Sequence, residues 1–300
     1  MTDSKPIFTI MFSHPILLRL ISFLLIATLF ACNDHRFPGL SPSRVRLKTL
    51  TEQSGSLQLV SQFQYDQQGR LSGIKTQKSD SARWEQSTYI YDNQNRLGQI
   101  QRVIQIILPV LPQEPPITKT DSYTFSYTGA GQIAEIRYVN NAANGLLFLC
   151  KPHYDAANQL DGNQVDSYNG YESVQFTSKY LYSNNNLTTA HVTFVPSGQS
   201  FEYTFTYDSK INPFYGIIMP IATLNQDPVT IAPISVFVYP PKNDGIANLL
   251  SLSRNNILSD GYNEYSYTYT SSGLPISRTA RSPLPDHSVR GTLYFEYESF

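Results

Sequence analysis

The chain has 300 residues, with 22 basic and 23 acidic side chains and a net charge of −1. This balance excludes a polybasic nucleic-acid surface and an acidic solvating tail. Charged residues make up only 15% of the chain, whereas Tyr (21) and Phe (16) are abundant, and ring side chains suit a pleated sheet. With 2 Cys a framework of several disulfides is also excluded. The composition therefore predicts a β protein that is large enough to fold around its own core.

The first predicted element is an apolar, charge-free stretch at residues 20–31. It is too short to cross a bilayer, which takes about 20 apolar residues. Lys5 and Arg19 place positive charge on its N-terminal side, a pattern typical of a secretory signal peptide. We therefore expect residues 1–31 to be a signal peptide, with Met11 as an alternative first residue.

The apolar stretch ends in Leu29-Phe30-Ala31-Cys32, which resembles a bacterial lipobox. The resemblance implies a thioether-linked lipid on Cys32, cleavage of the chain before this residue and acylation of the new amine. Several acyl chains hold a protein on a membrane where one would not, because each buried CH₂ contributes about 0.8 kcal/mol. An ordinary signal peptide followed by an incidental cysteine is the alternative.

The residues after Cys32 bear on which membrane holds this lipid anchor. Asn33, rather than Asp, follows the cysteine, which by the same resemblance favours the outer membrane and leaves the leaflet open. Residues 32–44 contain the Pro- and Ser-bearing stretch HRFPGLSPS and are expected to form the lipidated end and a tether.

The rest of the chain repeats one pattern, in which a Tyr ends a strand, a polar turn follows and an aliphatic residue starts the next strand. Asn, Asp and Gly fill the turns, because Gly and Asn tolerate positive φ and Asn and Asp bond to their own backbone. Rings alternate with small polar residues in Tyr123-Thr-Phe-Ser-Tyr127, and this period of two indicates strands. The six repeated segments are Phe63–Leu71, Tyr89–Leu97, Phe125–Ile133, Tyr154–Leu160, Tyr180–Leu187 and Tyr267–Leu274.

The spacing of the repeats fits two strands and two turns per unit. One interval, between Tyr91 and Tyr127, is longer than the others, because it contains the proline-dense insertion LPVLPQEPP at residues 108–116. Proline cannot donate a hydrogen bond to a β-ladder, so we expect this insertion to lie between two strands.

The pattern of Tyr65–Ile74, Tyr-Asp-x-x-Gly-Arg-Leu-x-x-Ile, resembles the YD (Rhs-like) repeat. Together with the lipobox and the YDSKINPF segment Tyr207–Phe214, it is similar to a family of uncharacterised Bacteroidota lipoproteins with degenerate YD repeats. The resemblance covers nearly the whole mature chain and implies a fold and a location, but no reaction. The chain departs from the pattern at Thr128, Ser183 and Thr270, where Asp is replaced.

These features predict one all-β domain over residues 45–300. Because a single hairpin is marginally stable, we expect the repeated antiparallel hairpins to share a long curved sheet, which either stays open or rolls into a closed barrel. Residues 212–248 interrupt the repeats with several prolines and many apolar residues. We expect an ordered excursion that covers the sheet or plugs a barrel, with a ligand gate as the alternative.

Four aspartates follow repeat tyrosines, and we expect them to cap turns by accepting hydrogen bonds from backbone N–H groups. A row of carboxylates that binds cations or a ligand is the alternative. The four are Asp66, Asp92, Asp155 and Asp208.

No motif of known chemistry is present: the sequence contains no P-loop, HExxH, GxSxG, GxGxxG or CxxC pattern. The spacing of His153, His191 and His287 does not indicate a zinc site. Residues 161–166, DGNQVD, lack the ligand spacing of a calcium loop, so a turn is predicted there. Cys150 lies among apolar residues and is expected to be buried and unreactive. We therefore predict no catalytic, cofactor or metal site, and Cys32 alone as a lipidation site.

The predicted function is a lipid-anchored protein of the cell envelope, at the outer membrane, that acts as a binding or structural scaffold. Its expected partners are the membrane, through the lipid, and an unknown envelope protein or glycan, with no nucleic acid. One alternative is a glycan or peptide receptor that uses exposed rings, although glycan sites favour Trp and Trp84 is the only one. The other alternative is an envelope hydrolase, which needs acidic or His side chains to converge in one pocket.

Overall fold

The computed structural model describes residues 45–80, 83–107, 115–140, 145–168, 173–195, 197–219 and 252–300. The chain divides into two compact units, Met1–Gly39 and Leu40–Phe300, and all described residues belong to the second. The predicted signal peptide, Cys32 and the tether lie outside the described residues. So do residues 108–114 of the proline-dense insertion and residues 220–251, which hold most of the predicted excursion.

Seventeen β-strands make up the described part of the chain, and their ladders are antiparallel. The described ranges contain no helix that is long and apolar enough to cross a membrane. The strands are β1 (Val45–Ser54), β2 (Leu57–Tyr65), β3 (Leu71–Lys78), β4 (Arg83–Tyr91), β5 (Leu97–Ile106), β6 (Ile117–Tyr127), β7 (Ile133–Asn140), β8 (Gly145–Tyr154), β9 (Leu160–Tyr168), β10 (Ser173–Ser183), β11 (Asn186–Phe194), β12 (Ser200–Thr204), β13 (Thr206–Ile211), β14 (Asn255–Ser259), β15 (Glu264–Tyr269), β16 (Pro275–Arg281) and β17 (Val289–Ser299).

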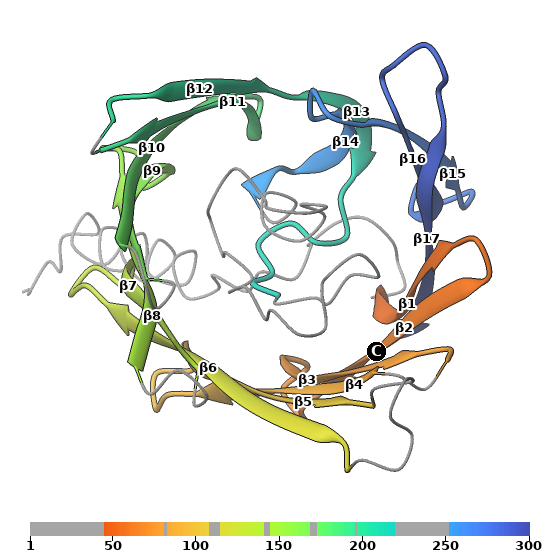
Figure 1. The fold of residues 1–300 in the computed structure, drawn as a ribbon, viewed down its shortest axis with the longest axis horizontal. Coiled ribbons are helices and arrows are strands. Elements are labelled where there is room, and N and C mark those ends of the chain that lie inside the picture. The colour runs from red at the N-terminus through yellow and green to blue at the C-terminus, as the bar shows by residue number, and fades with distance from the viewer. Residues whose placement is uncertain are drawn as a thin grey trace, which may run out of the picture. The chain divides into compact units, whose positions relative to one another are not determined.

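Apart from β12 and β13, strands that follow one another in the chain are paired in the sheet, as expected for repeated hairpins. β17 also pairs with β1, with Val45 opposite Ser299, so the last strand meets the first. Figure 1 shows the resulting ring of strands. β12 pairs with β11 and β13 pairs with β14, while Phe205 alone separates β12 from β13 along the chain. The predicted all-β sheet is confirmed, and it is rolled into a barrel with one unsealed seam between β12 and β13.

Side chains bridge this seam. Tyr207 of β13 donates a hydrogen bond from its hydroxyl to the Leu187 carbonyl of β11, at 2.6 Å. Asn186 Nδ2 donates to Asn255 Oδ1, and the Asn255 N–H donates back to Asn186 Oδ1, both at 2.9 Å. Ser253 Oγ accepts from the Leu187 N–H at 3.0 Å and donates to the Tyr207 hydroxyl at 2.8 Å. These bonds fasten the β10–β11 hairpin to the start of β14.

Burial alternates along the strands, with the buried side chains on the inside of the ring. In β5, Ile100 and Ile104 are buried, whereas Gln101 and Gln105 are exposed. The rings of the repeats belong to the same buried cluster or pack against it, which confirms that they share one side of the sheet. They include Phe63, Tyr65, Tyr89, Tyr91, Tyr123, Phe125, Tyr127, Tyr180, Tyr182 and Tyr265.

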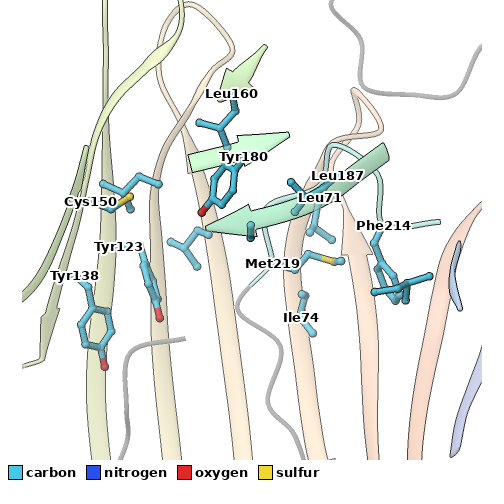
Figure 2. Packing of buried hydrophobic residues seen from close by; sticks show 14 of the residues in the cluster. Leu71, Ile74, Tyr123, Tyr138, Cys150, Leu160, Tyr180, Leu187, Phe214 and Met219 are labelled. Atoms are coloured by element: carbon cyan, nitrogen blue, oxygen red, sulfur yellow. The ribbon is translucent and has the colours of Figure 1, made fainter. Parts of the chain in front are cut away.

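The first residues of the predicted excursion run into the barrel. Figure 1 shows the chain after β13 turning to the inside of the ring, and Figure 2 shows Phe214 and Met219 among the core side chains. The Phe214 ring lies 5.8 Å, between centroids, from the ring of Phe295 on β17. Residues 212–219 therefore add side chains to the core instead of forming a free linker.

The turn that follows a repeat tyrosine is capped by its first residue. Asp66 Oδ1 accepts from the N–H groups of Gln68 and Arg70, each at 2.9 Å, and Asp92 and Asp155 accept equivalent pairs of bonds. The fourth turn residue has a positive φ, which glycine and asparagine adopt readily: Gly69 has φ 77° and Asn95 has φ 63°. The predicted capping role is confirmed for these three aspartates.

The remaining positions of the pattern vary this arrangement. Thr128 and Thr270, where Asp is lost, cap their turns with hydroxyls that accept from the N–H groups of Gln132 and Leu274. Asp208 lies within β13, where it accepts from the Lys210 N–H at 2.8 Å and from the Tyr269 hydroxyl. Asp208 thus accepts from a backbone N–H as predicted, but the predicted turn is wrong, because the chain continues there as a strand.

Six tyrosines that end strands also join their strand to another through the hydroxyl. Each of these six hydroxyls donates a hydrogen bond to a backbone carbonyl near the start of the other strand, at 2.6–3.0 Å. The donor–acceptor pairs are Tyr65–Leu47, Tyr91–Leu71, Tyr127–Leu97, Tyr207–Leu187, Tyr267–Ile257 and Tyr297–Pro275.

Candidate functional site

The inner face of β4–β7 carries a network of buried ionic side chains. Arg102 and Asp121 stand opposite each other in the β5–β6 ladder, and Arg102 Nε and Nη2 donate to the two carboxylate oxygens at 2.8 and 2.6 Å. Glu85 Oε1 lies 3.4 Å from Arg102 Nη1, and Glu85 Oε2 accepts from Arg83 Nη2 at 2.9 Å. Tyr138 donates to Asp121 Oδ2 at 2.9 Å. The register of three adjacent strands thus gathers two carboxylates and two guanidinium groups.

The chemistry of this network is that of a balanced set of ion pairs. Burial acts to lower the pKa of Arg102, but the negative charges of Glu85 and Asp121 raise it by a larger amount. The pKa therefore lies well above its usual value, and the guanidinium stays charged. A glycosidase needs one carboxyl group to give a proton and the other to act on water or on the sugar. Here both carboxylates bind arginine, so the network is suited to holding strands together.

The three histidines of the domain lie in separate surroundings. His153 Nδ1 is 2.5 Å from Asp161 Oδ1, His191 stands opposite Glu202 in the β11–β12 ladder, and His287 Nδ1 is 4.0 Å from Glu264. Among the residues that the structure describes, no group of three or more His, Cys, Asp or Glu side chains could hold a metal ion.

Two further sequence predictions concern β8 and β9. Residues 161–166 belong to strand β9, so the predicted turn is wrong. The backbone at Gly162 lies so close to β10 that a Cβ atom there would be 2.3 Å from the Ser178 carbonyl oxygen. Cys150 is 0% exposed, and burial raises the pKa of its thiol to about 12, so its predicted burial is confirmed.

Two arginines at the turn end of the barrel each connect one hairpin to the next. Arg70 donates from Nε to Asp66 Oδ2 at 2.7 Å, and its guanidinium carbon lies 4.1 Å from the centroid of the Tyr91 ring. Arg96 repeats this arrangement with Asp92, at 2.8 Å, and with the next repeat tyrosine. The carboxylates balance the guanidinium charges at this end, so these arginines have a structural role.

The outer face of β2–β5 is rich in glutamine and contains the only tryptophan of the chain. Trp84 stands opposite Gln77 of β3 and opposite Gln105 of β5. Gln86 is the next outward residue of β4, and the adjoining rows carry further glutamines. We term this surface the glutamine face, and it consists of Trp84 with Gln62, Gln64, Gln77, Gln86, Gln101 and Gln105.

The glutamine face is exposed and almost free of charge. Gln77, Gln101 and Gln105 are exposed, and Trp84 is half-buried. Across the same rows of β2–β5, Lys75 is the one charged side chain. Polar side chains at these alternate positions suit an aqueous surface, whereas a lipid-facing strand carries an apolar band.

The sequence did not lead us to this face because the prediction was built on the aromatic residues, whose side chains point to the core. The glutamines occupy the alternate, outward-facing positions of the same strands: Gln62 and Gln64 flank Phe63, and Gln101 and Gln105 lie between the buried positions of β5. What the pattern could not supply was the register that brings the glutamines of different strands into adjoining rows around Trp84.

Comparison with known proteins finds no matching family model and no matching curated protein. Among solved structures, a porin-like protein from Bacteroides uniformis is similar at 12% identity and a TM-score of 0.41, over 86% of this chain and 98% of that one. A porin-like protein from Bacteroides vulgatus is similar at 12% identity and a TM-score of 0.40, over 85% and 99%.

A chain described as TcdB2-TccC3-TEV is also similar, at 12% identity and a TM-score of 0.31. This similarity covers 78% of the present chain and 13% of the other, so the present chain spans a small part of that protein's length. At these levels of similarity no residue role is transferred to this chain.

Proposed function

We propose that this protein is a lipid-anchored scaffold of the cell envelope, which presents a binding surface on the outside of its barrel. The observation that carries the proposal is the division between the two faces of the sheet. The inner face is occupied by core side chains and by balanced ion pairs, whereas the glutamine face is turned to solvent. A rigid sheet with one exposed, side-chain-rich face is suited to binding, not to a reaction inside the ring.

The inner rings do not provide the receptor surface that the sequence suggested as an alternative. Tyr123 and Tyr138 are 0% exposed, and Tyr180 is 2% exposed. The hydrolase alternative also gains no support, since Glu85 and Asp121 bind arginine. Binding through the outer face is therefore the function that these residues support best.

The anchor rests on the lipobox-like sequence that ends at Cys32. A lipid there would tether the barrel to the membrane through residues 32–44. The resemblance to Bacteroidota lipoproteins with YD repeats supports the same location, at the outer membrane.

The anchor is tested by labelling cells of a Gram-negative host with radioactive palmitate while they make the full chain. We expect label in the wild-type chain and in Cys150→Ala, and none in Cys32→Ala. The Cys150→Ala variant is the matched control, because Cys32 and Cys150 are the two cysteines of the chain. Membrane fractionation should show Cys32→Ala released from the membrane pellet.

The proposal is overturned if Cys32→Ala keeps the label or remains in the membrane fraction as the wild type does. Loss of label in Cys150→Ala with its retention in Cys32→Ala would equally defeat it.

A further inference from the structure

We propose that the glutamine face binds a neutral polysaccharide, with one sugar ring stacked on Trp84 and sugar hydroxyls bonded to the flanking glutamine amides. This names a ligand class for the outer-face scaffold proposed above and rests on that function for its choice of surface.

Trp84 lies at the centre of a symmetric arrangement. Its strand is paired with β3 on one side and with β5 on the other, and the residues opposite it are Gln77 and Gln105. Neighbouring strands are about 4.8 Å apart, so an amide side chain starts at this distance on each side of the indole. A planar ring between two amides is suited to a flat ligand with polar edges.

The side chains match the two kinds of surface that a sugar presents. An indole is a large apolar face, which can cover the C–H face of a pyranose ring. A glutamine amide has two N–H donors and a carbonyl acceptor, so one side chain can bond to neighbouring hydroxyls as donor and acceptor together. The next two rows, both towards the Tyr91 end of β4, add Gln62, Gln86 and Gln101, so a chain of several sugars finds amides beyond the ring at Trp84.

Gly73 contributes room on this face. A Cβ atom at this position would lie 3.0 Å from Gln64 Oε1, so the Gln64 amide lies over the backbone of β3 where no side chain stands. The glycine thus lets Gln64 extend across β3 toward Thr88 and Gln101, which lie in the same row.

The near absence of charged side chains on the glutamine face suits an uncharged ligand. Nucleic acids and anionic lipid surfaces are bound by clusters of Lys and Arg, and the rows of β2–β5 hold Lys75 alone. An acidic polysaccharide would meet the same shortage of cations. Amide groups satisfy neutral hydroxyls without the cost of desolvating a charge.

The surroundings do not favour a peptide or a protein. A peptide that adds a strand needs a free sheet edge, whereas each of β2, β3, β4 and β5 is paired along both edges. The centre of a protein interface is rich in apolar and aromatic groups. Around Trp84 the rows hold two valines, Val103 opposite Gln86 and Val60 on the far side of Gln77, among the amides.

The test uses the full chain in detergent and the fluorescence of its only tryptophan. Because the chain has 1 Trp, every change in tryptophan emission reports on residue 84. Barley mixed-linkage β-glucan, hydroxyethylcellulose, amylopectin and yeast mannan are titrated separately, with polygalacturonate as the charged comparison. We expect a saturable change in emission with at least one neutral polymer and none with polygalacturonate. No saturable change with any neutral polymer, or an equal change with polygalacturonate, overturns the proposal.

Variants then assign the binding to this face. Gln77→Ala/Gln105→Ala keeps the fluorescent reporter and is expected to weaken binding at least about tenfold, since it removes the hydrogen bonds of two amides to the sugar hydroxyls. Gln164→Ala/Gln175→Ala, two exposed glutamines on β9 and β10, is the matched control and should bind as the wild type does. Circular dichroism checks that both variants are folded. Equal affinities for the two double variants would exclude the glutamine face as the site.

Trp84→Ala is followed by affinity electrophoresis in gels that contain the polymer bound by the wild type. We expect its retardation to be lost, and full retardation would overturn the stacking role. The Cys32→Ala chain should bind the same polymer with unchanged affinity. Failure of the anchor and failure of glycan binding are therefore distinguishable, because each has its own variant and its own readout.

Discussion

The hydroxyl of Tyr91, at the end of β4, donates a hydrogen bond to the carbonyl of Leu71, at the start of β3, over 2.8 Å. The β3–β4 ladder runs from Gly73 to Gln77 and does not reach Leu71, so the two strands diverge at this end. The Tyr91 side chain lies between the two diverging strands and bonds to the Leu71 carbonyl, which has no place in the β3–β4 ladder. Because five other pairs repeat this bond, the hydroxyl is the feature that explains why the repeat uses Tyr at this position and not Phe.

Tyr91→Phe should therefore lower the free energy of unfolding by about 1 kcal/mol, since the Leu71 carbonyl loses its partner. Tyr89→Phe is the matched control on the same strand. The Tyr89 hydroxyl is buried and finds no hydrogen-bond partner among the described residues, so its removal should be neutral or stabilising. Urea unfolding of both variants measures the difference, and equal losses would show that the bond to Leu71 contributes nothing.

The Asp92 turn should make the stability depend on pH in the acid range. Hydrogen bonds from the backbone and side chain of Arg96 lower the pKa of Asp92 below its usual 3.8, against a smaller effect of burial. A carboxyl group with a depressed folded-state pKa stabilises the fold above its unfolded pKa, and this contribution is lost as the pH falls through the folded value. Asp92→Asn should thus be less stable than the wild type at pH 7, and the gap should narrow as the pH falls below 3.8 and through the folded-state value. A gap of the same size at pH 7 and at pH 2 would show that the charge is irrelevant.

The periodicity of the repeats was sufficient to place the rings. Side chains alternate across a strand, so Phe63 and Tyr65 had to share a face once the segment was assigned as a strand. The same reasoning predicted the capped turns at Asp66 and Asp92, because their bonds are local and follow from the type of residue. It was wrong about the turn at Asp208, which lies in a strand and accepts a hydrogen bond from Tyr269, far along the chain, besides the predicted one from a backbone N–H.

Closure of the barrel and the glutamine face depend on contacts that no local pattern encodes. Arg46 Nε donates to Glu298 Oε1 at 2.6 Å, between residues that are 252 positions apart. Neither residue belongs to a repeat unit, so the hairpin pattern left an open and a closed sheet equally possible. The ion pair of Arg102 and Asp121 could not be predicted from the sequence either, because it follows from the register of β5 against β6.

Breaking that buried ion pair should be costly. Asp121→Ala removes the carboxylate that receives two hydrogen bonds from Arg102, whose side chain is 0% exposed, and it leaves the guanidinium with Glu85 alone. Removal of one partner from a buried pair costs about 3–5 kcal/mol. Glu135→Ala, which breaks an ion pair with the exposed Arg137, should cost less than about 1 kcal/mol. Thermal unfolding of the two variants tests this order, and its reversal would contradict the proposed balance of charges.

Gly162→Ala should destabilise the barrel by about 1–3 kcal/mol, because its new methyl group would meet the Ser178 carbonyl oxygen of β10. The two strands must move apart to make room, which stretches the ladder between β9 and β10. Gly129→Ala is the control, since a Cβ atom there meets nothing within 4 Å. Its effect should stay within about 0.5 kcal/mol. Equal unfolding midpoints in guanidinium chloride would place Gly162 farther from β10 than the structure has it.

The thiol of Cys150 should report on opening of the core. In the Cys32→Ser chain it is the only cysteine, and it stands opposite Ile136 of β7 and Val165 of β9, both 0% exposed. Because burial raises its pKa to about 12, little thiolate forms at pH 8 in the folded protein. A thiol reagent can therefore react only after β8 separates from β7 and β9. We expect Ellman's reagent to react at least about 100-fold more slowly in buffer than in 8 M urea. Similar rates in both would mean that the β7–β9 wall opens freely, and the packed inner face on which the scaffold proposal depends would be lost.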